Sequence, residues 1–482
     1  MGVRTATTIV ALLALVVPGP QSPTIHVLNA HFKPSGPRYE YVPFALSAGV
    51  EMVTISYRYS GDDGSSVIDL GLFEPGPLTI GTAAFRGYSG GAQRTITVGR
   101  NTASPGYEAR PLPAGLWHVM LGMYKVAPAG VDVTITVTEV REEPSAGPSA
   151  APKGPALQPP PSAGPGHAPG GPVVSDLPKW YSGALHLHTI HSDGVLTPAA
   201  LADTARDAGY DFIAITDHNN TTHTRDPLPA SPLHIVGEEV TTPGGHANVW
   251  GLPKGAWIDF RVSPGEPGAA DTINGWVDAA HKAGALFAIS HPFDTCGGCS
   301  WEQTIPGNLD GLEIWNGAKG PQEPAIAMWD RLLRAGRRVT AVGASDWHRP
   351  PTPIGAAAVR VLAPQLTEAA ILDGIRQHRV IVMRDARTPP PSVQARCGSN
   401  KAGVGDTLTC RADDELAVQV SMPDQAEGNA EFSLNAARLT TRAIGSGTTF
   451  TMPAAAGYLR VRVYAADGST VAITNPVYVQ TR

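Results

Sequence analysis

One stretch of low complexity constrains the fold of this chain more than any other feature. Residues 143–176 read EPSAGPSAAPKGPALQPPPSAGPGHAPGGPV and onward, and they are dominated by Pro, Gly and Ala. Such a composition cannot bury enough apolar surface to form a core, so we expect an extended linker. It separates residues 25–142 from everything after residue 178. A chain of 482 residues suggests about three domains at ~150 residues each.

The texture of the sequence differs among the three parts. Residues 25–142 hold short apolar runs such as Met52–Tyr59, bounded by Gly, Pro, Asp or Asn and without helical periodicity. This pattern predicts a β-sandwich, and residues 391–482 predict a second, smaller one. Between them, residues 178–390 alternate short apolar runs with helical patterns such as Pro198–Ala208. That alternation is typical of parallel strands in an α/β barrel.

The N-terminus has the order of features found in export signals. Arg4 precedes an unbroken apolar run, Ile9–Val17, and Pro18 then ends any helix there. We expect a secretory signal peptide over residues 1–22 and a secreted protein. The run is shorter than the ~20 apolar residues of a membrane-spanning helix, and no other segment is long enough. The alternative is a buried N-terminal strand.

Charge limits the partners of the chain. It carries 36 Lys and Arg against 42 Asp and Glu, a net charge of −6. Without a basic excess it cannot neutralise many phosphates, which excludes nucleic acid as an obligate partner. The sequence does not indicate the oligomeric state.

Four cysteines fit an oxidising compartment. Cys397 and Cys410 flank a turn-rich stretch between two predicted strands, where we expect a disulfide. Cys296 and Cys299 form a CxxC, for which we favour a disulfide that stiffens the loop. A metal pair, redox chemistry and free thiols remain alternatives, because one CxxC is a weak zinc signal.

Histidine placement carries the chemical information. Eleven of the 15 histidines lie between residues 178 and 390, most of them at or just after the end of a predicted strand. His186 and His188 are two apart on one strand, so both point to the same side; Asp346 and His348 repeat this spacing. Imidazoles and carboxylates that converge on one end of a barrel stay unpaired unless cations join them. The pattern predicts a multinuclear site for Zn, Mn or Fe.

Seven motifs in order resemble the polymerase and histidinol phosphatase (PHP) superfamily: HLHTIHSDG, AITDH, GEEVTT, GHANVWGL, SHPF, GLEIWN and GASDWH. The resemblance implies a distorted, TIM-like (β/α)₇ barrel with up to three metals, and hydrolysis of phosphoesters in most of its enzymes. The flanking pieces FRGYSGGAQRTITVG, SPGYEARPLPAGLWHVMLGMY and ITNPVYV are similar to those of the exported branch named after carbaryl hydrolase (CehA/McbA-like).

The resemblance also implies the metal ligands, and hence two to three divalent transition metals. The first metal would be held by His186, His188, Glu239 and Asp346, the second by Glu239, His246 and His291, and the third by Asp193, His218 and His348. The family motif GxE selects Glu239 over Glu238. Asp193 replaces the His of other members, which shifts the expected preference from Zn toward Mn or Fe.

The expected mechanism needs no side-chain nucleophile. A water that bridges two cations ~3.5 Å apart loses a proton near neutral pH and attacks the ester. The sequence has no GxSxG or P-loop motif. Three further residues are catalytic candidates. Asp217 would orient a ligand or take up a proton, Asn316 would line the pocket, and Arg349 would bind a substrate anion. The alternatives are a backbone cap, a turn cap and a surface arginine, respectively.

These observations predict a secreted, metal-dependent hydrolase with a small-molecule ester substrate, and a phosphoesterase is favoured. One alternative is a carbamate or carboxylic-ester hydrolase of the carbaryl-hydrolase type. The other is a non-catalytic protein that binds cell wall or glycan through its β domains.

Overall fold

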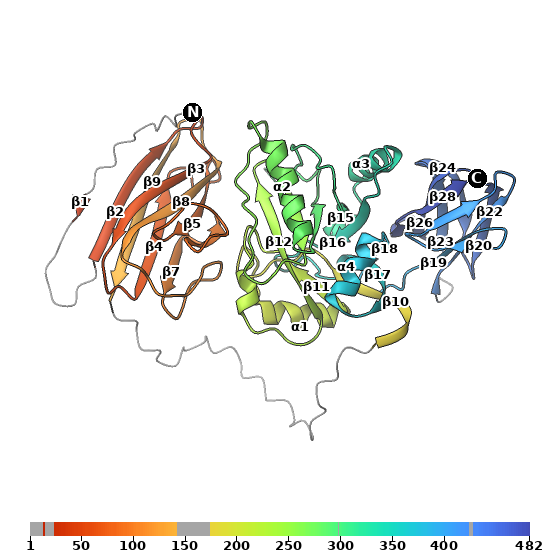
Figure 1. The fold of residues 1–482 in the computed structure, drawn as a ribbon, viewed down its shortest axis with the longest axis horizontal. Helices are drawn as coiled ribbons and strands as arrows, with labels where there is room; N and C mark the ends of the chain where they lie inside the picture. Colours follow the sequence, from red (N-terminus) through yellow and green to blue (C-terminus); the bar gives the residue numbers. More distant parts are fainter. Residues whose placement is uncertain (1–12, 15–23, 142–173, 297, 424–427) are drawn as a thin grey trace, which may run out of the picture.

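The computed structural model describes residues 13–14, 24–141, 174–296, 298–423 and 428–482. The predicted signal peptide over 1–22 falls outside these residues except for Leu13–Ala14, and the predicted linker falls outside them except for its last three residues. Three strand-rich regions lie in a row along the long axis (Figure 1). Within the described residues, no helix is both long and apolar enough to cross a membrane.

The N-terminal region is a sandwich of two antiparallel sheets. The outer sheet has the order β1 (Leu13–Ala14), β2 (Thr24–Phe32), β9 (Val131–Val140), β4 (Met52–Tyr59) and β7 (Thr95–Gly99). The other has the order β3 (Tyr39–Leu46), β8 (Gly115–Lys125), β5 (Val67–Phe73) and β6 (Phe85–Gly90). Buried side chains from both sheets, among them Ile55 and Leu70, form the core between them.

The central region contains seven strands that pair in chain order. They are β10 (Val174–Ala184), β11 (Phe212–Ile215), β12 (Leu233–Thr242), β13 (Gly245–Trp250), β14 (Leu286–Ile289), β15 (Gly311–Asn316) and β16 (Thr340–Ala344). All neighbours are parallel except β13, which is antiparallel to both β12 and β14. A parallel bridge between Leu187 and Trp347 joins the segments that follow the first and last strands, so the series returns on itself.

The described helices are fewer than a regular (β/α)₇ alternation has. In the described residues, only three α-helices connect these strands: α1 (Pro198–Ala208), α2 (Ala269–Lys282) and α3 (Glu323–Arg334). Short 3₁₀ turns, η1 (Thr222–Arg225) and η2 (Gly317–Lys319), follow β11 and β15. The antiparallel pair β12–β13 needs only a tight turn and no crossover helix.

Local sequence signals explain where the helices begin and end. In α1, the Thr197 side chain accepts a hydrogen bond from the Ala200 amide, Pro198 occupies the first turn, and Gly209 ends the helix in the left-handed conformation. The helix buries Leu201 and Ala205 against the sheet. It thereby fixes the strand ends on which the site is built.

The C-terminal region continues the central sheet. In the central region, β16 is followed along the chain by β17 (Ala356–Gln365), α4 (Glu368–Arg376) and β18 (Val380–Asp385). β17 pairs with β10, β18 pairs with β17, and β27 (Thr470–Thr474) of the C-terminal region pairs with β18. The sheet then runs through β26 (Gly457–Ala465), β23 (Gly428–Leu434) and β24 (Ala437–Ala443), with β21 (Thr407–Cys410) and β28 (Val477–Thr481) beside it. A second sheet holds β20 (Asn400–Ala402), β19 (Ser392–Cys397), β22 (Glu415–Ser421) and β25 (Thr448–Pro453).

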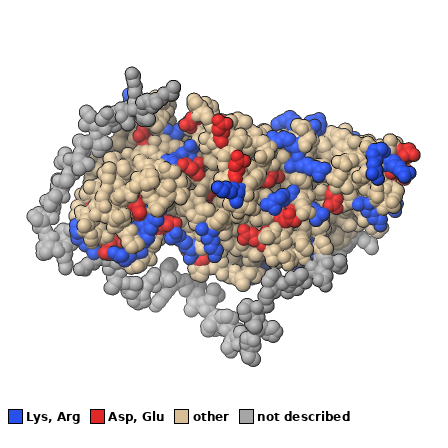
Figure 2. All heavy atoms as spheres, viewed as in Figure 1, with Lys and Arg blue, Asp and Glu red and all other residues tan. Residues whose placement is uncertain are grey.

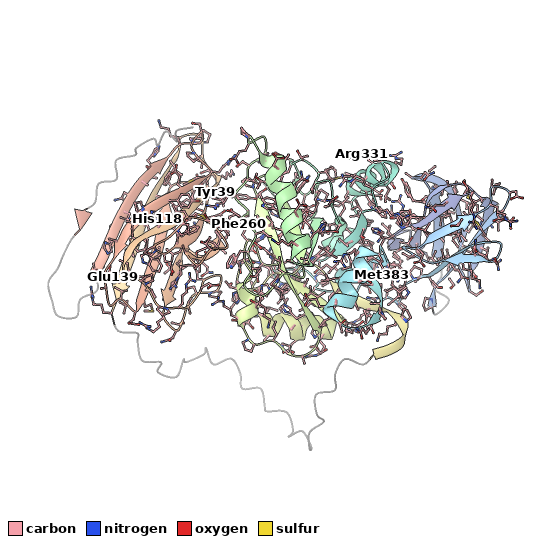
Figure 3. The ribbon with its side chains drawn as sticks, viewed as in Figure 1. Tyr39, His118, Glu139, Phe260, Arg331 and Met383 are labelled. Carbon is pink, nitrogen blue, oxygen red and sulfur yellow. A yellow bond between two sulfur atoms is a disulfide. The ribbon has the colours of Figure 1, made fainter. Side chains whose placement is uncertain are left out.

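The N-terminal sandwich packs on the central region through the sheet that contains β8. Phe73 and Met120 of the sandwich share one buried cluster with Phe260 of the centre. Tyr39 approaches Phe260 from the sandwich (Figure 3), with 6.1 Å between ring centroids. The Tyr88 ring is closer still, at 4.7 Å from Phe260. This apolar interface holds the sandwich in place.

The surface of this face mixes charges of both signs. Figure 2 shows Lys and Arg among Asp and Glu, with uncharged residues covering most of the area. Charged residues make up 16% of the chain, and exposed ion pairs contribute little to stability.

Candidate metal centre

The structure brings all nine predicted ligands to one end of the central strands. Most of them lie at or after the C-terminal end of a strand, as expected for parallel strands. His246 lies at the start of β13, which is antiparallel to β12 and so begins at the same end, and Asp193 lies in the loop after β10. Five overlapping groups of three or four His, Cys, Asp or Glu donors have their ligand atoms within 4.8 Å of one another. Four of them consist of His, Asp and Glu alone and could hold a metal ion, whereas the fifth includes Cys299, whose sulfur is in a disulfide. Every one of the nine belongs to at least one of these groups: His186, His188, Asp193, His218, Glu239, His246, His291, Asp346 and His348.

Glu239 is the first shared carboxylate of the cluster and is fully buried. Its Oε1 lies 3.2 Å from His186 Nε2, 3.2 Å from His246 Nδ1 and 3.1 Å from His291 Nε2. Two ligands that each lie ~2.1 Å from one ion are about 3.0–3.4 Å apart, for angles from square to tetrahedral. The spacing therefore fits donors that share a cation. The neighbouring Glu238 faces away and accepts a hydrogen bond from the Ile258 amide at 3.0 Å.

Asp346 is the second shared carboxylate. Its Oδ1 lies 3.2 Å from His186 Nε2 and 3.1 Å from His188 Nε2. Asp346 and His291 both adopt positive φ angles, 48° and 23°. Such backbone strain costs roughly 1–3 kcal/mol for a non-glycine residue and concentrates at functional sites. Here it turns both side chains toward the cluster.

The third group is the most open of the three. Asp193 Oδ1 lies 3.1 Å from His348 Nε2 and 3.6 Å from His218 Nε2. The Asp193 side chain is 39% exposed and that of His348 25%, whereas those of His188 and Glu239 are fully buried. A ligand that enters from solvent meets this group first.

The imidazoles and carboxylates of the cluster shift one another's pKa values strongly. Burial alone would raise the pKa of Glu239 and Asp346, but the facing imidazoles, above all His186, hold both pKa values well below the usual range. Despite burial, the carboxylates raise the pKa of His291 to about 9. Burial and two neighbouring imidazoles lower the pKa of His188 to about 4.

Two atoms in the middle of the cluster make no hydrogen bond of regular geometry with the described residues, His186 Nε2 and Glu239 Oε2. Their neighbours are other potential metal donors: His186 Nε2 lies 3.2 Å from Glu239 Oε1, and Glu239 Oε2 lies 2.8 Å from His218 Nδ1. Buried polar atoms without a well-formed hydrogen bond are costly unless a ligand satisfies them. Neutral imidazoles with carboxylates are the donor set of Zn, Mn and Fe, so the residues present fit divalent transition metals.

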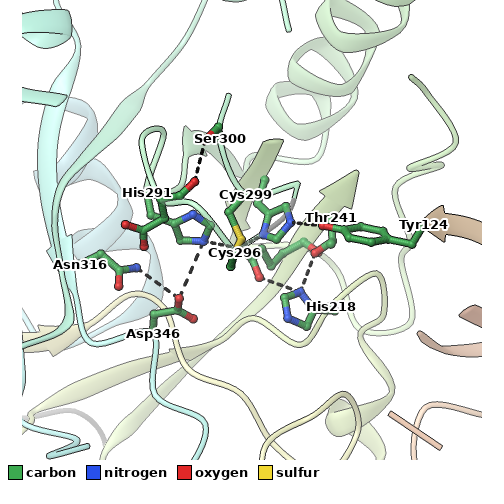
Figure 4. The surroundings of a disulfide bond; sticks show 12 residues. Tyr124, His218, Thr241, His291, Cys296, Cys299, Ser300, Asn316 and Asp346 are labelled. Atoms are coloured by element: carbon green, nitrogen blue, oxygen red, sulfur yellow. Dashed lines mark hydrogen bonds and ion pairs between the residues drawn. A yellow bond between two sulfur atoms is a disulfide. The ribbon is translucent and has the colours of Figure 1, made fainter. Parts of the chain in front are cut away.

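A layer of hydrogen bonds outside the cluster orients the ligands. Glu313 Oε2 lies 3.2 Å from His186 Nδ1, and its other oxygen accepts a hydrogen bond from Asn316 at 2.9 Å. Asn316 also donates to Asp346 Oδ2 at 3.3 Å (Figure 4). Partners of this kind fix the ring orientation and the tautomer of a ligating histidine. Asn316 thus contacts a predicted ligand rather than the cavity.

The structure does not bring Asp217 or Arg349 to the cavity. Asp217 is fully buried, and its Oδ1 accepts hydrogen bonds from the Thr189 amide and the Ser192 hydroxyl, both at 2.7 Å. Arg349 is exposed and donates to the backbone oxygen of Asp193 at 2.8 Å. Both residues hold the loop after β10, because that loop passes directly over their strand ends.

A cavity of about 550 Å³ opens over the cluster. Ligand side chains form its floor, and a disulfide between Cys296 and Cys299 lies on its rim (Figure 4). The predicted disulfides are confirmed, with Cα atoms 5.5 Å apart in this pair and 5.4 Å apart in Cys397–Cys410.

The remaining wall of the cavity comes from the N-terminal sandwich, and it was missed by sequence reasoning. Asp69, Tyr88 and Tyr124 all line the cavity. A signal for them exists in the sequence, because β5 and β8 are apolar on both faces, and a strand with two apolar faces must be covered on both.

Comparisons with known proteins add little to this geometry. No protein-family model matches the chain, and no curated protein matches it either. Among solved structures, it is similar to a two-domain protein from Bacteroides vulgatus that contains a PHP-like metal-dependent phosphoesterase. That likeness has 16% identity and a TM-score of 0.36, over 65% of this chain and 100% of that one.

Two further solved structures are each similar to a smaller part of the chain. A metal-dependent phosphoesterase from Bifidobacterium adolescentis has 19% identity and a TM-score of 0.25, over 36% of this chain and 90% of that one. An amidohydrolase from Chromobacterium violaceum, solved with sulfate and no metal, has 17% identity and a TM-score of 0.25, over 36% and 89%. These scores are low, so the function is inferred below from the donor geometry of this chain.

Proposed function

We propose that this chain is a metal-dependent hydrolase of the PHP superfamily, in its exported CehA/McbA-like branch, that cleaves an ester bond of a small molecule. Phosphoester hydrolysis is the favoured reaction. The observation that carries the proposal is the convergence of nine imidazole and carboxylate side chains around two shared carboxylates, with six of the nine lining a cavity of about 550 Å³. The domains are taken as residues 25–142, 178–390 and 391–482.

Buried and exposed residues of the cluster have different proposed roles. Glu239 and Asp346 each face several imidazoles and hold the centre of the cluster together. Asp193 and His348 form the exposed edge, where a substrate enters. Two or three Zn, Mn or Fe ions bound there would activate a water and offset the negative charge that develops on the ester.

The cavity lining bears on the choice between a phosphoester and a second candidate substrate. No Lys or Arg lies among the described residues that line it, so bound cations alone would neutralise a phosphate. The same lining is partly apolar, with Val67, Ala92 and the Tyr88 ring, which suits an aryl leaving group. A carbamate or carboxylic-ester hydrolase is therefore the second candidate. A non-catalytic wall- or glycan-binding role would not need a full set of donors.

One experiment separates these functions. The purified full-length protein is analysed for bound metal by mass spectrometry and assayed with an aryl phosphodiester, an aryl phosphomonoester and an aryl carbamate, each with and without chelator. We expect at least two metals per chain and chelator-sensitive phosphodiester hydrolysis. Faster carbamate cleavage would select the second candidate, and a protein that holds fewer than two ions would contradict both.

Export is part of the proposal. The two disulfides support an oxidising compartment. Expression of the full-length gene should release a protein whose N-terminus, determined by sequencing, lies after residue 17. Retention inside the cell with residues 1–22 intact would contradict export.

A further inference from the structure

The N-terminal sandwich contributes side chains to the cavity through one face of a single strand. In β8, alternate residues point to opposite faces, so Trp117, Val119 and Leu121 enter the core of the sandwich. Met120 points the other way and joins the cluster shared with the central region. Tyr124 lies four residues after Met120 and therefore on the same face. It reaches the cavity (Figure 4).

The Tyr124 hydroxyl meets one specific ligand side chain. It lies 3.4 Å from Nε2 of His246, within hydrogen-bond distance. The other ring nitrogen of His246, Nδ1, faces Glu239 Oε1 at 3.2 Å. The same carboxylate oxygen faces the nitrogens of His186 and His291. Nδ1 is thus the nitrogen on the side of the cluster, and Nε2 is the nitrogen on the side of Tyr124.

We propose that Tyr124 is a positioning residue for the metal centre: its hydroxyl accepts the Nε2 proton of His246 and leaves Nδ1 unprotonated toward the cluster. A neutral imidazole carries one ring proton, and the partner of one nitrogen fixes which nitrogen is free to ligate. In this arrangement the N-terminal sandwich completes a site whose ligands all come from the central region. The inference rests on the proposed function, because it assigns His246 to a metal.

The surroundings hold the Tyr124 ring in this place. A Cβ at Gly298 would lie 2.1 Å from the Tyr124 hydroxyl, so only glycine lets the loop of the rim disulfide pass so close. The backbone there has a φ of 129°, which also favours glycine. Another hydrogen bond also joins the two regions: the Gly106 amide of the sandwich donates to His191 Nδ1 of the central region at 3.3 Å. These contacts together hold the sandwich against the central region.

The test compares two tyrosine-to-phenylalanine variants of the full-length protein. Tyr124→Phe removes the hydroxyl that contacts His246. The matched control, Tyr458→Phe, removes a buried hydroxyl through which the other sandwich contacts Asp330 of the central region, at 3.2 Å. The dissociation constant of Mn²⁺ alone is measured by competition with a chelator, and thermal unfolding of each metal-free variant is recorded.

We expect Tyr124→Phe to weaken the binding of one Mn²⁺ by ~10–100-fold, the usual effect of losing the outer partner of a ligand. Its unfolding temperature without metal should match that of Tyr458→Phe, whose Mn²⁺ binding should equal that of the wild type. Equal Mn²⁺ affinity of Tyr124→Phe and wild type would overturn the inference and leave the proposed function standing. A wild type that binds no Mn²⁺, Zn²⁺ or Fe²⁺ would overturn both.

Discussion

The two β-sandwiches flank the same central region but are attached to it in different ways. The C-terminal one continues the central sheet by backbone hydrogen bonds between β18 and β27. Its Asn475 is fully buried and bonds to both the amide and the carbonyl of Ala341 in β16. Among the residues that the structure describes, the N-terminal sandwich shares no sheet with the centre, and it docks through apolar side chains.

The difference follows from which part of the central strands each sandwich covers. The N-terminal sandwich places side chains such as Asp69 over the strand ends where the ligands converge. The C-terminal one contacts α3 through Tyr458 and Arg460, away from the cavity. The same architecture thus forms a wall of the cavity on one side and a structural support on the other. Variants in each region should separate ligand binding from stability.

The largest effect should come from the ligand cluster itself. Asp346→Asn removes the charge shared by His186 and His188. We expect the loss of at least one bound metal and a fall in hydrolysis of about 10³-fold, near the upper end for the loss of one electrostatic group. Metal content and kcat/KM are the measurements. Asp203→Asn, on the exposed face of α1, is the control and should change neither.

The next largest effect should come from a change where the C-terminal sandwich contacts the central region, and it should alter stability alone. Arg460 pairs with Asp330 at 3.0 Å, and both side chains are at most 10% exposed. Arg460→Ala leaves a buried carboxylate without its partner, which costs about 3–5 kcal/mol of unfolding free energy. Denaturant unfolding measures this loss. Metal content and kcat of the folded protein should stay at wild-type values; a loss of metal would mean that this sandwich also supports the site.

Removal of each of the two disulfides should likewise separate an effect on stability from an effect on substrate binding. Cys397–Cys410 closes a loop with a sequence separation of 13, and its replacement by two serines should lower stability by about 3 kcal/mol without changing KM. Cys296–Cys299, with a separation of 3, should cost about 2 kcal/mol. Because it lies on the rim of the cavity, its replacement should also change KM. If KM is unchanged in the variant without Cys296–Cys299, the loop at the rim of the cavity does not contribute to substrate binding.

A pH effect should arise beneath the N-terminal sandwich. Burial raises the pKa of Glu238 from 4.5 to about 8. The folded state therefore keeps a proton that the unfolded chain releases, so this contribution to stability is present below pH 4.5 and is lost as the pH rises to about 8. The slope for one group is at most about 1.4 kcal/mol per pH unit.

Glu238→Gln tests this effect, because the amide keeps an oxygen for the Ile258 amide and cannot ionise. Its unfolding free energy should decline less than that of the wild type between pH 5 and pH 9. Parallel curves for the two proteins would show that Glu238 does not titrate in this range. Ile258 adjoins Trp257 and Phe260, whose rings the N-terminal sandwich contacts. The curves therefore report on the N-terminal docking surface and not on the C-terminal one.

Much of the site could be predicted because strand ends repeat a simple rule. Polar residues that directly follow short apolar strands, such as His218 after β11 and His291 after β14, must lie at the end of the sheet where those strands end. The direction of Asp217 could not be predicted, because it depends on how the loop after β10 folds back over it. The number of helices could not be predicted either. Strand β13 is antiparallel to β12 and needs no helix between them, and the alternation of apolar runs with helical patterns does not show in which direction a strand runs.

The wall formed by the N-terminal sandwich was out of reach of sequence reasoning for another reason. The pattern of β8 shows that both faces are covered, but it does not show by what. Tyr124 lies 122 residues from His246, and their contact depends on the docking of two regions. Contacts of this range are set by tertiary packing, not by local sequence.

The bridge between Leu187 and Trp347 falls between His186 and His188 on one side and between Asp346 and His348 on the other. The seam at which the first strand meets the last is therefore also the point where ions would be gripped. A cation bound there would be coordinated from both sides of the seam, so that binding of the metal and closure of the central sheet would be coupled.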